Sequence, residues 1–259
     1  MTKAINNPIQ IYSYNYLNAK CLFEAAGGQS LDFLKLCDFE CYNDDLAFIS
    51  AQTSLNFSCW FKDKFGEFLT RNIDTFILQN CNVETMQIKY IDSSENEILA
   101  YTLTDNLNGE IKITLPQKIT TSKIIFNIQS TFDNKSVKIG QLRVLEKIFD
   151  LEATTEADVN YTAKDGSLRT YNGRLITWTD FSKWSANIDV KNMSKEQYKL
   201  LKAFIRRDGF ITIIPFSDFE DRDVYETFVR RQDLNYKINR WSGLLDVNLK
   251  LEAQENAAN

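Results

Sequence analysis

Any chemistry in this chain has to rest on carboxylates, lysines, tyrosines and thiols, because none of its 259 residues is a histidine. The absence of histidine removes Ser-His-Asp and Cys-His nucleophile pairs, histidine-ligated zinc and the usual general base near neutral pH. The nine glycines are scattered and form no phosphate-binding loop. We therefore predict a protein that is not an enzyme, with no catalytic, cofactor-binding or metal-ligating residues. An unfamiliar enzyme that works with carboxylates remains an open alternative.

The five cysteines lie in the first third of the chain, at Cys21, Cys37, Cys41, Cys59 and Cys81. An odd number of cysteines, with no apolar secretory segment at the start, favours reduced thiols in a cytosolic setting. Three residues separate Cys37 from Cys41, but no second close pair follows to complete a tetrahedral zinc site. Cys59 and Cys81 have apolar and aromatic neighbours, so we expect buried small side chains rather than metal or redox use.

Three groups of carboxylates could bind a cation or act as acid and base: the cluster Asp218, Glu220, Asp221 and Asp223, the pair Asp44 and Asp45, and the pair Glu152 and Glu156. Calcium prefers such oxygen ligands, but the cluster lacks the glycine and the terminal glutamate of an EF-hand loop. A solvated acidic loop is the favoured interpretation. Nothing in the sequence places either pair in a pocket.

Aromatic and basic residues offer two further kinds of binding site. The four tryptophans, Trp60, Trp178, Trp184 and Trp241, could stack on sugars, although core packing or anchoring of an interface is more usual. The doublets 206–207 and 230–231 are each two arginines. Because the net charge is −5, a nucleic-acid patch is disfavoured, and ion pairs between subunits are the more plausible use.

The elements that would position these residues are mostly strands. Apolar residues are 44% and charged residues 25% of the chain, which is ordinary globular composition. Apolar runs reach only about five residues, far short of a membrane span. From about residue 47, apolar and polar residues alternate in short segments, with polar turns such as residues 92–96 between them and a possible bulge at Gly140. This spacing predicts a β-sandwich over residues 1–150.

The second half adds one helix to its strands. Ser194 and Gln197 form a capping-box pattern, and apolar residues at helical spacing follow, so we predict a helix over residues 194–208. Asp-Gly at 165–166 and Asn-Gly at 172–173 predict hairpin turns. Residues 245–252 alternate cleanly and predict an antiparallel strand, and 255–259 a frayed tail. The whole is mainly β, with a β-barrel or sandwich carrying one helix over residues 151–259.

Two stretches resemble known families. Residues 72–82, 86–90, 123–127 and 139–144 resemble the galactose-binding-like jelly roll used in phage tail and adsorption proteins. Residues 194–204, 209–216, 224–229 and 241–252 resemble the tail-tube-like domain of distal-tail, minor-tail and baseplate proteins of long-tailed phages. The resemblance rests on the order of strands and helix rather than on an invariant motif.

The resemblance implies a structural protein of a phage or phage-like tail, located in the particle tail and made in the cytoplasm of the bacterial host. Its expected partners are copies of itself in a hexameric or trimeric ring, together with tail-tube, hub and tape-measure proteins. DNA would only pass through, which the acidic charge excess suits. The polar alternating strands and the arm over residues 9–16 could supply edges that pair with a neighbouring subunit. The alternative is a carbohydrate-binding module or adhesin for host-surface attachment, based on the jelly roll and the tryptophans.

Overall fold

The computed structural model describes most of the chain: residues 9–26, 31–37, 47–151, 156–169, 175–208, 210–214, 225–228, 234–238, 241–253 and 256–257. The chain divides into two compact units. One is formed by residues 15–147, called the sandwich unit below, and the other by the first fourteen residues together with residues 148–259, called the C-terminal unit. The division differs from the predicted 1–150 and 151–259 because the amino-terminal strand belongs to the C-terminal unit.

The sandwich unit consists of two antiparallel sheets and a short 3-10 helix at Phe33–Cys37. The four-stranded sheet has the order β3 (Phe48–Ile49), β10 (Lys138–Leu145), β5 (Arg71–Cys81) and β8 (Ile111–Thr121). The five-stranded sheet has the order β2 (Leu22–Ala25), β4 (Leu55–Trp60), β9 (Lys123–Thr131), β6 (Val83–Ile91) and β7 (Glu97–Leu103). The predicted N-terminal β-sandwich is confirmed.

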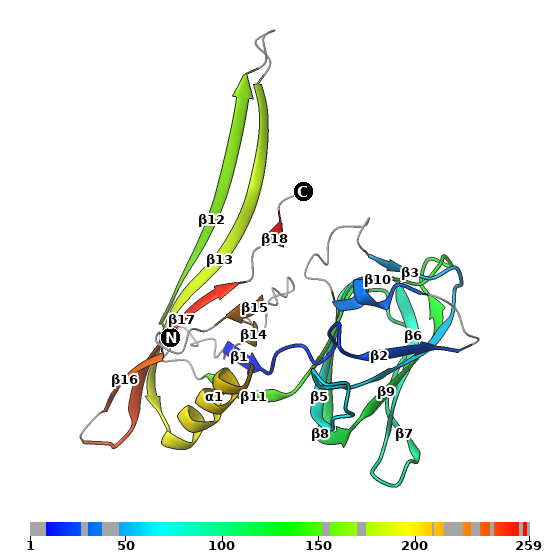
Figure 1. Cartoon of the computed structure of the whole chain (residues 1–259), viewed down its shortest axis with the longest axis horizontal. Helices are drawn as coiled ribbons and strands as arrows, with labels where there is room; N and C mark the ends of the chain where they lie inside the picture. Colours follow the sequence, from blue (N-terminus) through cyan, green and yellow to red (C-terminus); the bar gives the residue numbers. More distant parts are fainter. Residues whose placement is uncertain are drawn as a thin grey trace, which may run out of the picture. The chain divides into compact units, whose positions relative to one another are not determined.

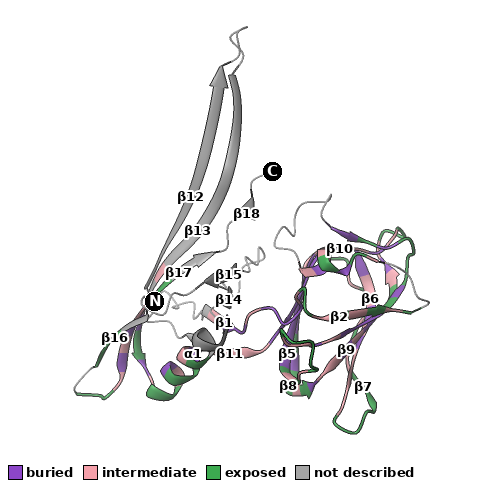
Figure 2. Ribbon diagram, in the orientation of Figure 1, coloured by how far each residue is buried: buried purple, intermediate pink, exposed green. Residues whose placement is uncertain are grey.

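Stacked phenylalanines fill the core of the sandwich unit, where the buried residues gather (Figure 2). Phe57 of β4 lies 5.0 Å, centroid to centroid, from Phe126 of β9, and Phe126 lies edge-on to Phe76 of β5 at 6.0 Å. Phe33 continues the stack to Phe48 at 5.4 Å. All five rings are at most 7% exposed, so each sheet contributes one apolar face to a shared core.

Local signals account for several features of this unit. Met86 and Ile88 are buried while Gln87 and Lys89 between them are not, as the alternation predicts. The predicted turn at 92–96 is closed by the Asp92 carboxylate, which accepts the Asn96 N–H, and this hydrogen bond lowers the pKa of Asp92. The bulge considered at Gly140 is absent, because the β10–β5 register continues unchanged from Ile139 to Gln141.

One nine-stranded sheet forms the C-terminal unit. Its main path is β11 (Lys147–Leu151), β1 (Ile9–Tyr12), β14 (Phe210–Ile214), β15 (Tyr225–Phe228), β17 (Leu245–Ala253), β13 (Leu175–Met193) and β12 (Glu156–Arg169). Off this path, β16 (Leu234–Ile238) pairs with β17, and β18 (Asn256–Ala257) pairs with β13. The path ends at β11 and β12, so the described strands form an open sheet where a barrel or sandwich was expected.

The amino-terminal arm is an internal strand of this sheet. In β1, Gln10, Ile11 and Tyr12 pair antiparallel with β14, and β11 lies on the other side. Ile11 is fully buried and Tyr12 is 1% exposed. The prediction that this arm pairs with a neighbouring subunit is therefore wrong for residues 9–12, because their hydrogen-bonding edges are occupied within the chain.

The predicted helix is confirmed as α1 (Lys195–Asp208). Its capping box is formed in both directions: the Ser194 hydroxyl accepts the Gln197 N–H at 3.1 Å, and the Gln197 side-chain oxygen accepts the Ser194 N–H at 3.0 Å. In β17, Leu245, Val247 and Leu249 are buried and alternate with less buried polar residues, also as predicted. No helix within the described residues has the length and apolar character needed to cross a membrane.

Two turn predictions of the second half have different outcomes. Residues 165–166 do not form a turn, because they lie inside β12, where the pairing with β13 shifts register between Lys164 and Asp165 and then continues. β12 and β13 form a long two-stranded ribbon (Figure 1). The Asn-Gly turn predicted at 172–173 lies outside the described residues. The predicted tail contains β18, whose Asn256 and Ala257 pair with β13.

Candidate functional site

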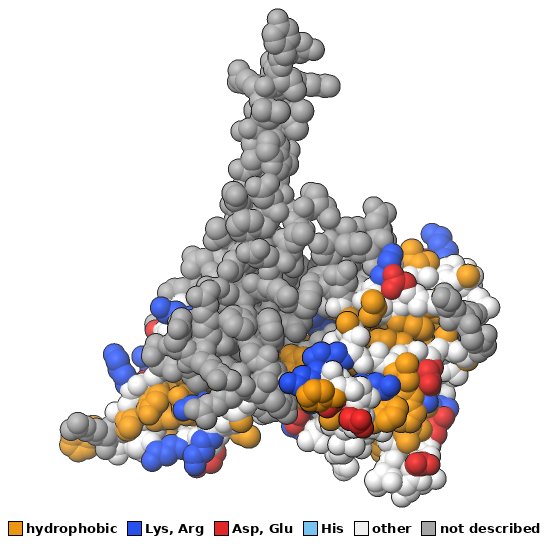
Figure 3. Space-filling view, viewed as in Figure 1, with side chains coloured by type: hydrophobic (Ala, Val, Ile, Leu, Met, Phe, Trp, Pro, Cys, Tyr) orange, Lys and Arg blue, Asp and Glu red, His pale blue; other side chains and the backbone are white. Residues whose placement is uncertain are grey.

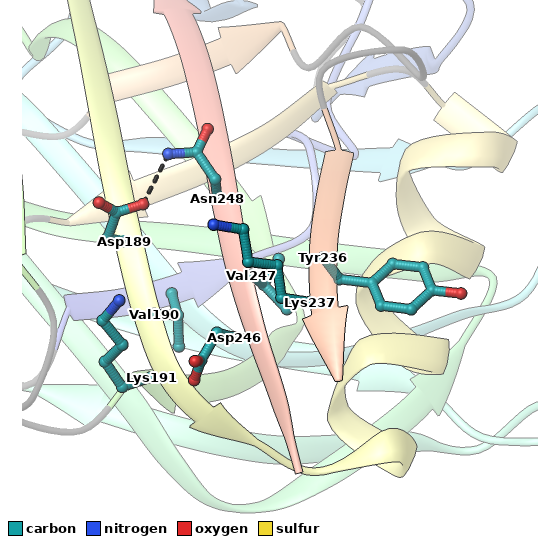
Figure 4. A pocket seen from close by; sticks show the side chains of 8 residues that line it. All are labelled: Asp189, Val190, Lys191, Tyr236, Lys237, Asp246, Val247 and Asn248. Carbon is teal, nitrogen blue, oxygen red and sulfur yellow. Dashed lines mark hydrogen bonds between the residues drawn. The ribbon is translucent and has the colours of Figure 1, made fainter. Parts of the chain in front are cut away.

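A shallow hollow of about 320 Å³ lies on the C-terminal unit and is lined by β13, β16 and β17 (Figure 4). Its charged lining residues are Asp189, Lys191, Lys237 and Asp246. The Asp189 carboxylate accepts a hydrogen bond from the Asn248 amide at 2.6 Å, and the Asp246 carboxylate accepts the Asn192 N–H at 3.2 Å. Both carboxylates are therefore held by amide groups of the β13–β17 pair, which suits a stabilising role in the sheet.

A second candidate lies on the sandwich unit and consists of three aromatic side chains, Trp60, Phe65 and Phe68, called the aromatic platform below. Trp60 is the last residue of β4, and the two phenylalanines lie in the loop that follows. Phe65 is 78% and Phe68 58% exposed, while Trp60 is half-buried. The Trp60 and Phe68 rings are 5.1 Å apart and tilted by 54°. Trp60 and Phe68 are thus in contact at the surface, and Phe65 is exposed in the same loop.

A hydrogen-bonded loop holds the platform in place. Lys62 and Phe68 form an isolated antiparallel bridge, and the Asp63 carboxylate accepts the Phe65 N–H at 2.7 Å and the Glu67 N–H at 3.0 Å. Gly66 has a φ of +89°, in the left-handed region where other residues are strained. The loop is consequently a defined turn built on the Asp63 side chain.

A lysine ammonium group lies over one face of each of the three rings. The Lys123 ammonium is 4.5 Å from the Trp60 ring centroid and 3.6 Å from Glu24 Oε2. The same Glu24 oxygen accepts the Trp60 indole N–H at 3.2 Å. Lys62 and Lys64 lie 4.7 and 4.9 Å from the centroids of Phe68 and Phe65. The platform therefore combines three aromatic rings, each with a cation over one face, with one carboxylate acceptor, and a ligand would pack on the opposite faces.

Strand register brings Trp60 and its ionic neighbours together. Trp60 pairs with Lys123 of β9 on one side and with Leu22 of β2 on the other. Side chains directly opposite each other on neighbouring strands lie on the same face of a sheet, so Lys123 has to flank the indole. Orange apolar and blue basic side chains lie next to one another on the visible face of this unit (Figure 3).

The tryptophans singled out from the sequence have different positions. Trp60 belongs to the platform, and Trp241 is fully exposed in the turn before β17. Trp178 and Trp184 belong to β13, but their side chains lie outside the description. Phe65 and Phe68 were not anticipated, although the Asp63 to Gly66 spacing is a turn signal that places them in a loop.

The remaining candidates are only partly described. The acidic cluster 218–223, the pair 44–45, the doublet 230–231 and Cys41 lie outside the described residues, and the doublet 206–207 is known only as backbone of α1. Within the described part, no three His, Cys, Asp or Glu side chains come together in a way that could hold a metal ion. Cys59 and Cys81 are buried, as predicted.

Comparisons with known proteins found similarity in solved structures alone: no protein-family model and no curated protein matches the chain. The chain is similar to a family 32 carbohydrate-binding module of Streptococcus pneumoniae EndoD, with 14% identity, a TM-score of 0.45, and coverage of 51% of this chain and 99% of that one. It is also similar to the family 32 module of C. perfringens NanJ in complex with galactose (15% identity, TM-score 0.39, coverage 55% and 100%) and to a Streptococcus pneumoniae fucose-binding module (12%, 0.38, 50% and 96%). These structural neighbours are carbohydrate-binding modules, and at such TM-scores the similarity carries no argument about function.

Proposed function

We propose that the sandwich unit is a non-catalytic carbohydrate-binding module and that its ligand lies on the aromatic platform. The observation that carries this proposal is the exposure of Phe65 and Phe68 beside Trp60 on an ordered loop. Burying a phenylalanine side chain stabilises a protein by roughly 1.5–3 kcal/mol. Two exposed phenylalanines give up this stabilisation unless a ligand covers them. A partner with flat apolar faces and a polar rim would recover it.

A pyranose ring has those properties. Its C–H bonds form an apolar face that can pack on Phe68 or Phe65, and its hydroxyl groups can donate to Glu24 and accept from the neighbouring lysines. Aromatic stacking combined with a few hydrogen bonds in a shallow, solvated site corresponds to a Kd of about 10 µM to 1 mM. Multivalent glycans would bind more tightly through avidity.

The proposal is tested by titrating the full chain with galactose, fucose and an oligosaccharide panel, using tryptophan fluorescence and calorimetry. Trp60 is the only tryptophan of residues 15–147, so ligand on the platform should change its emission. We expect saturable binding that Phe68→Ala weakens at least tenfold, about 1.4 kcal/mol, with the thermal transition nearly unchanged.

Trp241→Phe is the matched control, because Trp241 is exposed but lies in the C-terminal unit. It should leave both the affinity and the ligand-induced emission change intact. The proposal fails if no glycan of the panel saturates the protein, or if the double variant Phe65→Ala, Phe68→Ala binds as tightly as the original chain.

We propose, as a second candidate, that the C-terminal unit builds a ring in a phage-like tail. The observation in its favour is the open sheet: within the described strands, β12 pairs with β13 alone over Glu156–Arg169, and β11 ends the opposite side. A long edge strand is a template for pairing with another chain. Because the two ends of the sheet differ, pairing of one copy's β12 with another copy's β11 would be head-to-tail, which forms a ring when the rotation between copies closes. Tail-tube, hub and tape-measure proteins would be the neighbours and DNA the passing cargo.

Mass photometry of the full chain, with and without tail partners, tests this candidate. Neighbouring strand residues direct their N–H groups to opposite edges, so Asn160→Pro and Tyr161→Pro remove donors from different sides of β12. We expect trimers or hexamers that one of the two substitutions disrupts while the fold survives. Monomers under all conditions, or rings indifferent to both substitutions, would contradict the candidate.

A further inference from the structure

Two cysteines lie on neighbouring strands at the edge of the five-stranded sheet. In the β2–β4 pair, Leu22 is opposite Trp60 and Phe23 is opposite Cys59. Cys21 directly precedes β2, which puts it on the same face as Phe23 and diagonal to Cys59. The carbonyl of Asn18 accepts the Cys21 N–H at 3.0 Å and fixes the backbone at this point. Strand pairing therefore places the two thiols one diagonal step apart on the same face of the sheet, although they are far apart in the sequence.

The two thiols differ in environment. Cys59 is fully buried, whereas Cys21 is partly exposed. The neighbouring Cys59 side chain is the largest influence on Cys21 and lowers its pKa, with Arg71 as a weaker contributor. The Cys21 thiol donates to the Tyr16 carbonyl at 3.3 Å, and the Cys59 thiol donates to the Trp60 carbonyl at 3.9 Å. Burial, and then the hydrogen bond to Cys21, raises the pKa of Cys59. The partly exposed Cys21 is thus the more readily ionised of the two thiols, and the buried Cys59 is the less readily ionised.

We propose that Cys21 and Cys59 are a disulfide-forming pair that closes when the protein meets a disulfide oxidant such as oxidised glutathione. The Cys21 thiolate attacks one glutathione sulfur, which breaks the glutathione S–S bond and releases one glutathione thiol. Cys59 then loses its proton and attacks the Cys21 sulfur, which forms the intramolecular S–S bond and releases the second glutathione thiol. Two electrons and the two cysteine protons pass to the glutathione, so the exchange balances.

The link would fasten the outermost strand of the sheet. β2 has only four residues and, within the described strands, pairs with β4 alone. Its Leu22 and Glu24 flank Trp60, so a covalent bond between Cys21 and Cys59 would hold β2 beside the aromatic platform. The inference stands on the thiol geometry and does not depend on carbohydrate binding.

The test uses the full chain, reduced and then equilibrated with oxidised glutathione. Intact mass should fall by the mass of two hydrogens, peptide mapping should join Cys21 to Cys59, and the thermal transition of the sandwich unit should rise by roughly 5–10 °C. Cys21→Ser should abolish all three effects. Cys81→Ser is the matched control and should abolish none, because Cys81 lies in the other sheet, where burial raises its pKa to about 11.

Three results would overturn the proposal. The chain would remain fully reduced at glutathione ratios that oxidise ordinary protein dithiols, or glutathione would remain attached to Cys21 because Cys59 does not displace it. The third result is a disulfide that joins Cys37 to Cys21 or Cys59 in the peptide map, since Cys37 also raises the pKa of Cys59. The intact-mass measurement does not depend on any variant, so misfolding of Cys21→Ser leaves the proposal testable.

Discussion

Phe126→Ala is expected to lower the free energy of unfolding of the sandwich unit by about 3–5 kcal/mol. Phe126 is completely buried and joins the two sheets, with its ring 5.0 Å from Phe57 and 6.0 Å from Phe76. Alanine would leave a cavity between the two sheets, and Phe57, which also packs against Phe33, cannot move to fill it. Since typical domains are stable by only about 5–15 kcal/mol, much of the unit's stability would be lost.

Urea unfolding followed by pulsed hydrogen exchange and mass spectrometry measures the unfolding of each unit separately, from the amide protection of its own peptides. Peptides of β4 and β9 should lose protection at lower urea in Phe126→Ala, whereas the control Phe65→Ala, at an exposed ring, should shift them little. Equal shifts in the two variants would mean that the stacked rings are not the core. This measurement also checks the packing on which the position of Trp60 depends, because β9 pairs with β4.

Ile11→Pro is expected to destabilise the C-terminal unit by about 3 kcal/mol or more while the sandwich unit remains protected. Ile11 is fully buried in β1, which has β14 on one edge and β11 on the other. Proline has no backbone N–H. Because both edges of an internal strand are hydrogen-bonded to neighbouring strands, proline removes a hydrogen bond of the sheet whichever edge the N–H faces. Ile11→Val, which keeps the donor and most of the side chain, should cost only about 0.5–1.5 kcal/mol.

The same exchange experiment measures this effect in peptides of β14, β15 and β17. Loss of protection confined to these strands would support a C-terminal unit completed by the amino-terminal strand. Full protection in Ile11→Pro would contradict the internal position of β1 and restore the picture of a free arm that pairs with a neighbouring subunit.

Features of the fold that depend on nearby residues could be predicted from the sequence. The helix begins directly after Ser194 because the Ser194 and Gln197 side chains satisfy each other's backbone N–H groups, and both lie within one turn. Strand β17 could also be predicted from nearby residues, because alternation of apolar and polar residues indicates a strand with one buried face. Neither feature depends on where the rest of the chain lies.

Features of the fold that depend on residues distant in the sequence could not be predicted. Gln10 pairs with Ile214, and no local pattern indicates which of several strands an isolated β segment will join. Asp165 and Gly166 have the composition of a turn, but the pairing of β12 with β13 on both sides outweighs that preference. The aromatic platform was missed because a phenylalanine in a β-rich segment is usually a core residue, and its exposure follows from tertiary packing.

The platform is the central claim, and a structure of the full chain with its best-binding glycan tests it most directly. Isotope-labelled protein titrated with that glycan gives the same information in solution by chemical-shift mapping. The account predicts a sugar ring packed against Phe65 or Phe68, with hydroxyl groups within hydrogen-bonding distance of Glu24 or Lys123. A glycan bound in the hollow of Asp189 and Asp246, or elsewhere on the protein with the platform unperturbed, would contradict it.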